Sequence, residues 1–121
     1  MRETIRPATA EDLAAAGVVP ARGGRWLAVL QGERLLGVGG IVPVGAMWVA
    51  SCRIQPEARQ NLRAHRRALL EAARRVLELA QSRKMPVYAE PEAGIQTAGA
   101  FLAHLGFTRH PAGGYVRGGE R

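Results

Sequence analysis

The order of elements between residues 46 and 107 limits the fold more than any other feature of this chain. An apolar strand over residues 46–54 and a basic turn precede a helix over residues 62–83, where apolar residues recur at helical spacing. A short strand at 86–89 follows, and then a helix over 95–105 that Gly106 ends as its C-cap. This order of strands and helices is typical of a sheet whose faces are covered by helices.

The remaining segments add strands that are joined mostly by short turns. They predict a strand at 3–7, a helix that Thr9 caps and Gly17 ends, a hairpin of strands 25–30 and 35–42, and a closing hairpin of strands 107–109 and 114–117. We therefore predict an α/β (α+β) fold. It has one mixed, mostly antiparallel sheet of six or seven strands, splayed after the fourth strand and flanked by about three helices. Residues 1–117 form a single domain in this prediction, and 118–121 form a flexible tail.

A run of glycines, Gly37-Val38-Gly39-Gly40, lies inside one predicted strand. A dinucleotide-binding loop would need a helix directly after the glycines, and the sequence predicts none there. We therefore expect the glycines to mark a bulge or a close approach of neighbouring backbone.

Positive charge is concentrated in the second half of the chain. The formal net charge is +7, and nine basic residues between positions 53 and 84 face only three glutamates. Such a segment predicts attraction to an anionic partner, which includes the phosphates of a cofactor, a nucleic acid and an acidic protein surface. The alternative is that these charges only solvate one face of a helix.

Composition also excludes several classes of protein. The single cysteine, Cys52, cannot form an internal disulfide, and its apolar surroundings predict a buried, inert thiol. No apolar stretch approaches the ~20 residues that cross a bilayer, and the first residues do not begin a signal peptide. We expect a cytoplasmic protein without a metal site.

Two phrases carry a resemblance to a known family. Phe101-Leu102-Ala103-His104-Leu105-Gly106-Phe107 closes the order of elements described above, and Ile5-Arg6-Pro7-Ala8-Thr9-Ala10-Glu11-Asp12 opens the chain. Together they resemble the core of GNAT-type N-acetyltransferases, which transfer an acyl group from coenzyme A to an amine. The resemblance implies acetyl-CoA as the cofactor and an N-acyltransferase as the function, with a small-molecule or protein amine as the acceptor.

The family's turn of the pattern Gln/Arg-x-x-Gly-x-Gly/Ala wraps the pyrophosphate of acyl-CoA. Here it reads Arg59-Gln60-Asn61-Leu62-Arg63-Ala64, with leucine at the first glycine position. Backbone N–H groups at a helix N-terminus attract anions, and neighbouring arginines add charge. The resemblance thus implies these cofactor-binding residues: Ile54, Arg59, Gln60, Asn61, Leu62, Arg63, Ala64 and Arg66.

The family's usual catalytic residues are replaced. The position of the tyrosine that protonates the departing thiolate holds Leu102, the position of an accessory asparagine holds Ile95, and the fourth strand has no carboxylate. The candidates that remain for proton transfer are Glu90, after the fifth strand, and His104. His65, His110 and Glu92 are further candidates, and His65 is expected to be a solvated residue in the first turn of the long helix or a phosphate contact.

Residues 51–60 are also similar to small GNAT-like proteins of bacteriophages and prophages, in which the cofactor motif is often degenerate. That similarity keeps a second function open, a non-catalytic binding module whose basic helix start docks an anionic partner. Direct nucleic-acid binding is disfavoured because no aromatic residues are interleaved with the basic ones. Residues 18–24 leave no room for the second helix of larger family members, so the amine-binding side is expected to be open or completed by a second subunit of a homo-oligomer.

Overall fold

A computed structural model describes residues 3–20, 22–81, 86–89, 102–103, 105–111 and 113–117. Its elements are, in chain order, β1 (Glu3–Pro7), α1 (Ala10–Ala15), β2 (Arg25–Gln31), β3 (Arg34–Val44), β4 (Met47–Ile54), α2 (Pro56–Arg59), α3 (Leu62–Gln81), β5 (Val87–Ala89), β6 (Thr108–Arg109) and β7 (Tyr115–Arg117). Most of the helix expected at 95–105, the tail at 118–121, and Glu90 and His104 lie outside the described residues.

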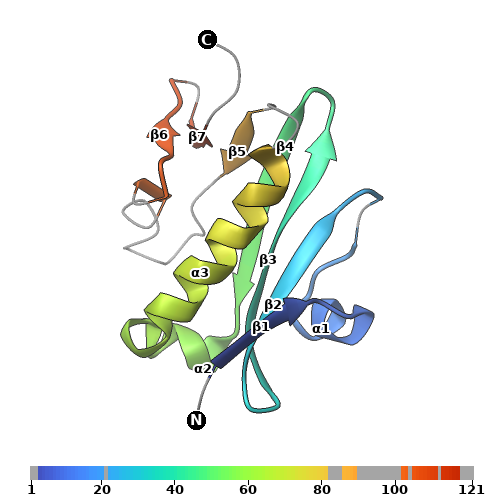
Figure 1. Ribbon diagram of the computed structural model, residues 1–121, viewed down its shortest axis with the longest axis vertical. Coiled ribbons are helices and arrows are strands. Elements are labelled where there is room, and N and C mark those ends of the chain that lie inside the picture. Colours follow the sequence, from blue (N-terminus) through green and yellow to red (C-terminus); the bar gives the residue numbers. More distant parts are fainter. Residues whose placement is uncertain are drawn as a thin grey trace.

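The strands form one seven-stranded sheet in the order β1-β2-β3-β4-β5-β7-β6. Every neighbouring pair is antiparallel except β4 and β5, which are parallel and are connected through α3. The prediction of a mixed, mostly antiparallel sheet of six or seven strands flanked by helices is therefore confirmed. Figure 1 shows α3 lying across one face of the sheet and α1 near the end formed by β1 and β2.

The core is divided between the two faces of the sheet. On the α3 face, Trp48 of β4 and Phe107 pack with the buried side of α3 in the largest cluster of apolar residues. On the opposite face, Leu13 of α1 packs on Ala28 and Val38 of the sheet. Apolar residues of α3 recur at helical spacing, so one side of α3 is buried and its arginines remain exposed.

Local signals set both ends of α1. The Thr9 side chain accepts from the Asp12 N–H while the Asp12 carboxylate accepts from the Thr9 N–H, which is a capping box. At the other end Gly17 has φ of 76°, and the Val18 N–H donates to the Leu13 carbonyl. These are the bonds of a Schellman motif, which ends a helix at glycine.

The glycine run of β3 has both of the properties that were predicted for it. A bulge shifts the β2–β3 register, because Val29 pairs with Gly37 while Leu30 pairs with Leu35. A Cβ on Gly37 would stand 2.8 Å from the carbonyl oxygen of Arg53 on β4, so the two backbones approach closely there.

Two expectations about single residues are wrong. His65 is buried, because its side chain turns toward β1 and binds Glu3. Cys52 is exposed, and it lies on the stretch of β4 beyond the last pair with β5.

Candidate functional site

β4 and β5 separate in the middle of the sheet. They pair through only three residues each, and Ala50 with Ala89 is the last pair. Beyond it β4 continues through residues 51–54, while the described part of β5 ends. Among the described residues, these four positions have a strand partner only on the β3 side. The backbone groups of the other edge are therefore available to a ligand or to another segment.

The β3 glycines hold this open stretch of β4 in place from behind. Its four residues pair with Gly37, Val38, Gly39 and Gly40. Gly40 also lies under the Trp26 ring, where a Cβ would collide with the indole. Small residues at these positions let β3 approach both the ring on one strand and the backbone on the other.

A short helix, α2, connects β4 to α3, although the sequence was expected to form only a turn there. Pro56 begins α2, a position at which proline fits because its missing N–H has no partner in a helix anyway. The Gln55 N–H donates to the Leu36 carbonyl at 2.8 Å, and Ala58 is buried against β2 and β3. The entry to α3 is thus anchored to the sheet.

The backbone amides of the predicted phosphate turn are partly used within the protein. Four of the six N–H groups donate to nearby carbonyls, and these are Arg59 to Gln55 at 3.0 Å, Gln60 to Pro56 at 3.3 Å, Asn61 to Ala58 at 3.0 Å and Ala64 to Asn61 at 3.1 Å. Leu62 and Arg63 are the first two residues of α3, where N–H groups have no partner inside the helix. Fewer backbone N–H groups of this turn are therefore available to an anion than the sequence implied.

Side chains around this turn are mostly basic and exposed. Arg59, Arg63 and Arg66 are exposed, as are Gln60, Asn61 and Ala64. Leu62 is half-buried, and Ile54 packs against the cluster beneath α3. No acidic partner lies within ion-pair distance of Arg63 or Arg66 among the described residues. All eight predicted cofactor residues therefore lie in the segment that runs from the end of β4 into the first turns of α3.

His65 lies directly behind this turn. Its Nδ1 atom is 2.6 Å from the Glu3 Oε2 atom, and only 5% of the His65 side chain is exposed. The pair joins the first turn of α3 to β1, at the far edge of the sheet from β6. Sequence reasoning missed this contact because the two residues are 62 positions apart.

The Cys52 thiol lies on the open stretch of β4. Burial by surrounding atoms raises its pKa, and the charges of Arg53 and Arg59 act in the opposite direction with smaller effect. The residue as a whole is nevertheless exposed. A thiol with a raised pKa is a poor nucleophile, so the expectation of an unreactive cysteine is retained although its burial was wrong.

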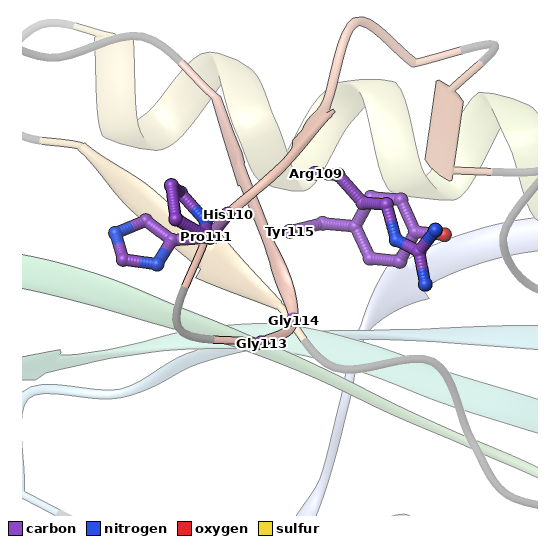
Figure 2. Close-up of a pocket in the computed structure, with 6 residues that line it drawn as sticks. All are labelled: Arg109, His110, Pro111, Gly113, Gly114 and Tyr115. Carbon is purple, nitrogen blue, oxygen red and sulfur yellow. The ribbon is translucent and has the colours of Figure 1, made fainter.

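On the other side of the opening lies the hairpin of β6 and β7. Its loop and strands line a pocket of about 510 Å³, made by Arg109, His110, Pro111, Gly113, Gly114 and Tyr115 (Figure 2). Tyr88 of β5 holds the loop, because its hydroxyl donates to the Gly113 carbonyl at 3.2 Å. A hairpin was predicted here, but no local pattern in residues 107–117 indicates a pocket.

Some of the predicted catalytic positions lie among the described residues and others do not. Glu90 and His104 lie outside the described residues, so their placement stays a prediction. Leu102 is half-buried and packs against the core cluster of Trp48 and Phe107. Among the described residues no group of three or more histidine, cysteine or acidic side chains is arranged to hold a metal ion. No described helix is both long and apolar enough to span a membrane.

This arrangement of seven strands with a parallel β4–β5 pair is the fold of the GNAT-type N-acetyltransferases. The similarity comes from structure alone, since neither a scan of protein-family models nor a search of curated proteins gave a match. YhhK from E. coli, solved bound to coenzyme A, has a TM-score of 0.66 and 22% identity, and the match covers 98% of this chain and 100% of that one.

Two further solved structures show the same fold at lower identity. The PaiA N-acetyltransferase from Thermoplasma acidophilum, in complex with coenzyme A, has a TM-score of 0.67 at 10% identity and covers 100% of both chains. A GNAT-family acetyltransferase from Staphylococcus aureus has a TM-score of 0.62 at 14% identity, with 98% of this chain and 100% of that chain covered. At such identities the comparison establishes the fold of this chain.

Proposed function

We propose that the protein is an acyl-CoA-dependent N-acyltransferase that acts on an amine. One observation carries the proposal. Among the described residues, β4 positions 51–54 have no strand partner on the β5 side, and this strand edge leads through the short α2 into the basic start of α3. An acyl-CoA needs both features, because its pantetheine arm is an amide chain and its pyrophosphate is an anion. That two structures with this fold were solved with coenzyme A bound supports the same ligand here.

In this proposal the pyrophosphate lies at the N-terminus of α3. The N–H groups of Leu62 and Arg63 point toward it, and Arg59, Arg63 and Arg66 add charge-assisted hydrogen bonds. Leu62 is half-buried. The pantetheine arm then runs along β4 toward the level of Ala50 and Ala89, where the strands separate.

Chemically, the amine nitrogen would attack the carbonyl carbon of the thioester. An N–C bond forms, the C–S bond breaks, the amine loses a proton to a base, and the sulfur leaves as a thiolate that takes up a proton. We keep Glu90 and His104 as the proposed proton-transfer groups. Leu102 has no proton to donate, so we expect thiolate departure to be slow.

A specific observation also favours a second candidate, a non-catalytic binding module. Among the described residues, four exposed arginines of α3 have no ion-pair partner, and these are Arg63, Arg66, Arg67 and Arg74. Like charges spaced along one helix destabilise it slightly unless an anion lies against them. Under this reading the basic helix docks an anionic partner and no acyl transfer takes place.

Calorimetric titration with acetyl-CoA tests the first candidate. We expect saturable binding, and we expect the double variant Arg63→Ala/Arg66→Ala to weaken it by about tenfold or more, or about 1.4 kcal/mol. The matched control is Arg22→Ala/Arg25→Ala, which removes two exposed arginines at the start of β2. Equal affinity in both double variants would place the cofactor elsewhere, and absence of binding would favour the binding module.

A further inference from the structure

Four residues on neighbouring strands form one row across the sheet. Ala50 of β4 pairs with Ala89 of β5, Ala89 pairs with Tyr115 of β7, and Tyr115 pairs with Arg109 of β6. The row lies at the level where β4 and β5 separate. Paired residues project to the same face of a sheet. Arg109 is thus in line with the end of the opening to which the acyl group is assigned above.

In Figure 2 the Arg109 side chain extends on the same side as the ring of its cross-strand partner, Tyr115, and away from His110 and Pro111. Tyr115 itself packs against the core, and its ring is therefore a fixed support for the arginine. Arg109 has no ion-pair partner among the described residues, and none of the six residues that line the pocket is acidic.

The described residues of the loop that forms the rest of the pocket are held by hydrogen bonds and packing. The His110 N–H donates to the Gly114 carbonyl and the Gly113 N–H donates to the His110 carbonyl, both at 2.9 Å. The Tyr88 ring meets the His110 ring edge-on, with centroids 6.4 Å apart. Gly114 has φ of 73°, and a Cβ on it would collide with the Tyr88 hydroxyl. A pocket preformed in this way loses little entropy when a ligand enters it.

We infer that this pocket binds a carboxylate carried by the acceptor amine. The inference rests on the proposed acyl transfer and adds the class of acceptor. A single planar guanidinium matches the two oxygens of a carboxylate and balances its one negative charge, whereas it would leave one charge of a doubly charged phosphate unbalanced. The distance from β7 to the middle of the β4–β5 opening is one and a half strand spacings, or about 7 Å. That span fits a short aliphatic amine with a carboxylate at its other end.

Two-dimensional NMR of the full chain with and without saturating coenzyme A tests this, using 4-aminobutyrate and butylamine as probes of equal chain length. We expect 4-aminobutyrate to shift the amide signals of Gly113 and Gly114 and to bind at least about tenfold more tightly than butylamine. Arg109→Gln should abolish that preference, and Arg109→Lys should keep part of it. Arg25→Gln, which removes an exposed arginine at the start of β2, should leave it unchanged.

Equal affinity for the two probes would overturn the inference, as would shifts confined to the first turn of α3. A tighter complex with 3-aminopropylphosphonate than with 4-aminobutyrate would contradict the carboxylate as the preferred group. The readout does not depend on turnover. If acetyl-CoA fails to bind while 4-aminobutyrate still shifts the Gly113 and Gly114 signals, the proposed function fails and the carboxylate pocket remains. If acetyl-CoA binds and the probes bind equally, only the pocket assignment fails.

Discussion

Nδ1 of His65 and Oε2 of Glu3 are 2.6 Å apart, and this contact joins the start of α3 to β1 at the edge of the sheet. His65 is nearly enclosed and Glu3 is the partner that satisfies its ring nitrogen. A buried polar group without its partner loses the hydrogen bond and is still kept from water. The contact therefore stabilises both the fold and the position of the helix start that is proposed to bind phosphate.

Replacing Glu3 by alanine should destabilise the protein by about 1–3 kcal/mol, because the buried His65 ring would lose its partner. Urea unfolding measures this directly. Glu78→Ala is the control, since Glu78 is exposed on α3 and makes no ion pair among the described residues. If the two variants unfold at the same urea concentration, the contact contributes nothing measurable.

Gly37→Ala should cost about 1–3 kcal/mol, because the new Cβ would stand 2.8 Å from the Arg53 carbonyl oxygen and would force β3 away from β4. Gly39→Ala serves as a matched control two residues along the same strand. Its Cβ would meet nothing closer than the Ser51 carbonyl oxygen at 3.9 Å, so we expect a change near zero. Thermal or urea unfolding compares them, and similar losses in both would show that the close approach is not the cause.

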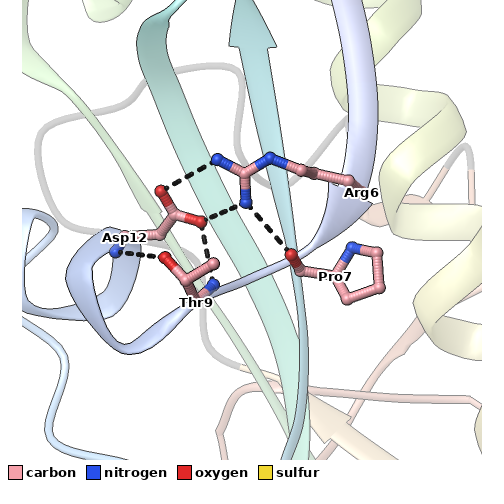
Figure 3. Close-up of polar contacts among 4 residues, drawn as sticks. All are labelled: Arg6, Pro7, Thr9 and Asp12. Carbon is pink, nitrogen blue, oxygen red and sulfur yellow. Dashed lines mark hydrogen bonds and ion pairs between the residues drawn. The ribbon is translucent and has the colours of Figure 1, made fainter.

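The ion pair between Arg6 and Asp12 makes stability depend on pH (Figure 3). The hydrogen bond from Arg6 lowers the pKa of Asp12, burial opposes this, and bonds from Thr9 lower it further. A carboxyl with a lowered folded-state pKa stabilises the protein fully above its unfolded pKa of about 4, and this stabilisation is lost as the pH falls through the folded pKa.

Asp12→Asn should therefore destabilise the protein at pH 7, by less than about 1 kcal/mol because the Arg6 end of the pair is exposed to solvent. The difference from wild type should shrink as the pH is lowered below 4. Unfolding measured at several pH values checks this, with Glu11→Gln, an exposed neighbour in α1, as the control. A difference that is constant with pH would contradict the assignment.

Leu102→Tyr should increase the release of free thiol from acetyl-CoA in the presence of an amine, because a hydroxyl would be placed at the position where the family carries its proton donor. General acids typically contribute about 10²–10⁴-fold, so a gain of tenfold or more is expected even from an imperfect placement. Leu102→Phe is the control, since it adds a similar ring to the same half-buried position without a hydroxyl. A wild-type protein that already turns over at tens per second would show that another group serves, and Glu90 and His104 would be mutated next.

Much of the fold follows from patterns that act over a few residues. The apolar spacing in 62–81, the capping pair of Thr9 and Asp12, and the glycine that ends α1 each specify local backbone geometry through neighbouring hydrogen bonds. The glycine run of β3 could likewise be interpreted without coordinates, since a strand tolerates glycines where backbones approach. Even α2 has a local signal, because a proline at its first position is typical of a helix start.

Local patterns therefore specify the type and order of most elements and the class of fold. The packing of the whole chain brings together residues that are far apart in the sequence, such as His65 with Glu3 and Tyr88 with the Gly113 carbonyl. It also decided that Cys52 is exposed although it lies in an apolar run. Helix caps, turns and apolar periodicity depend on residues that are near neighbours in the sequence. Contacts across the sheet depend on strand order and register, which no short segment specifies.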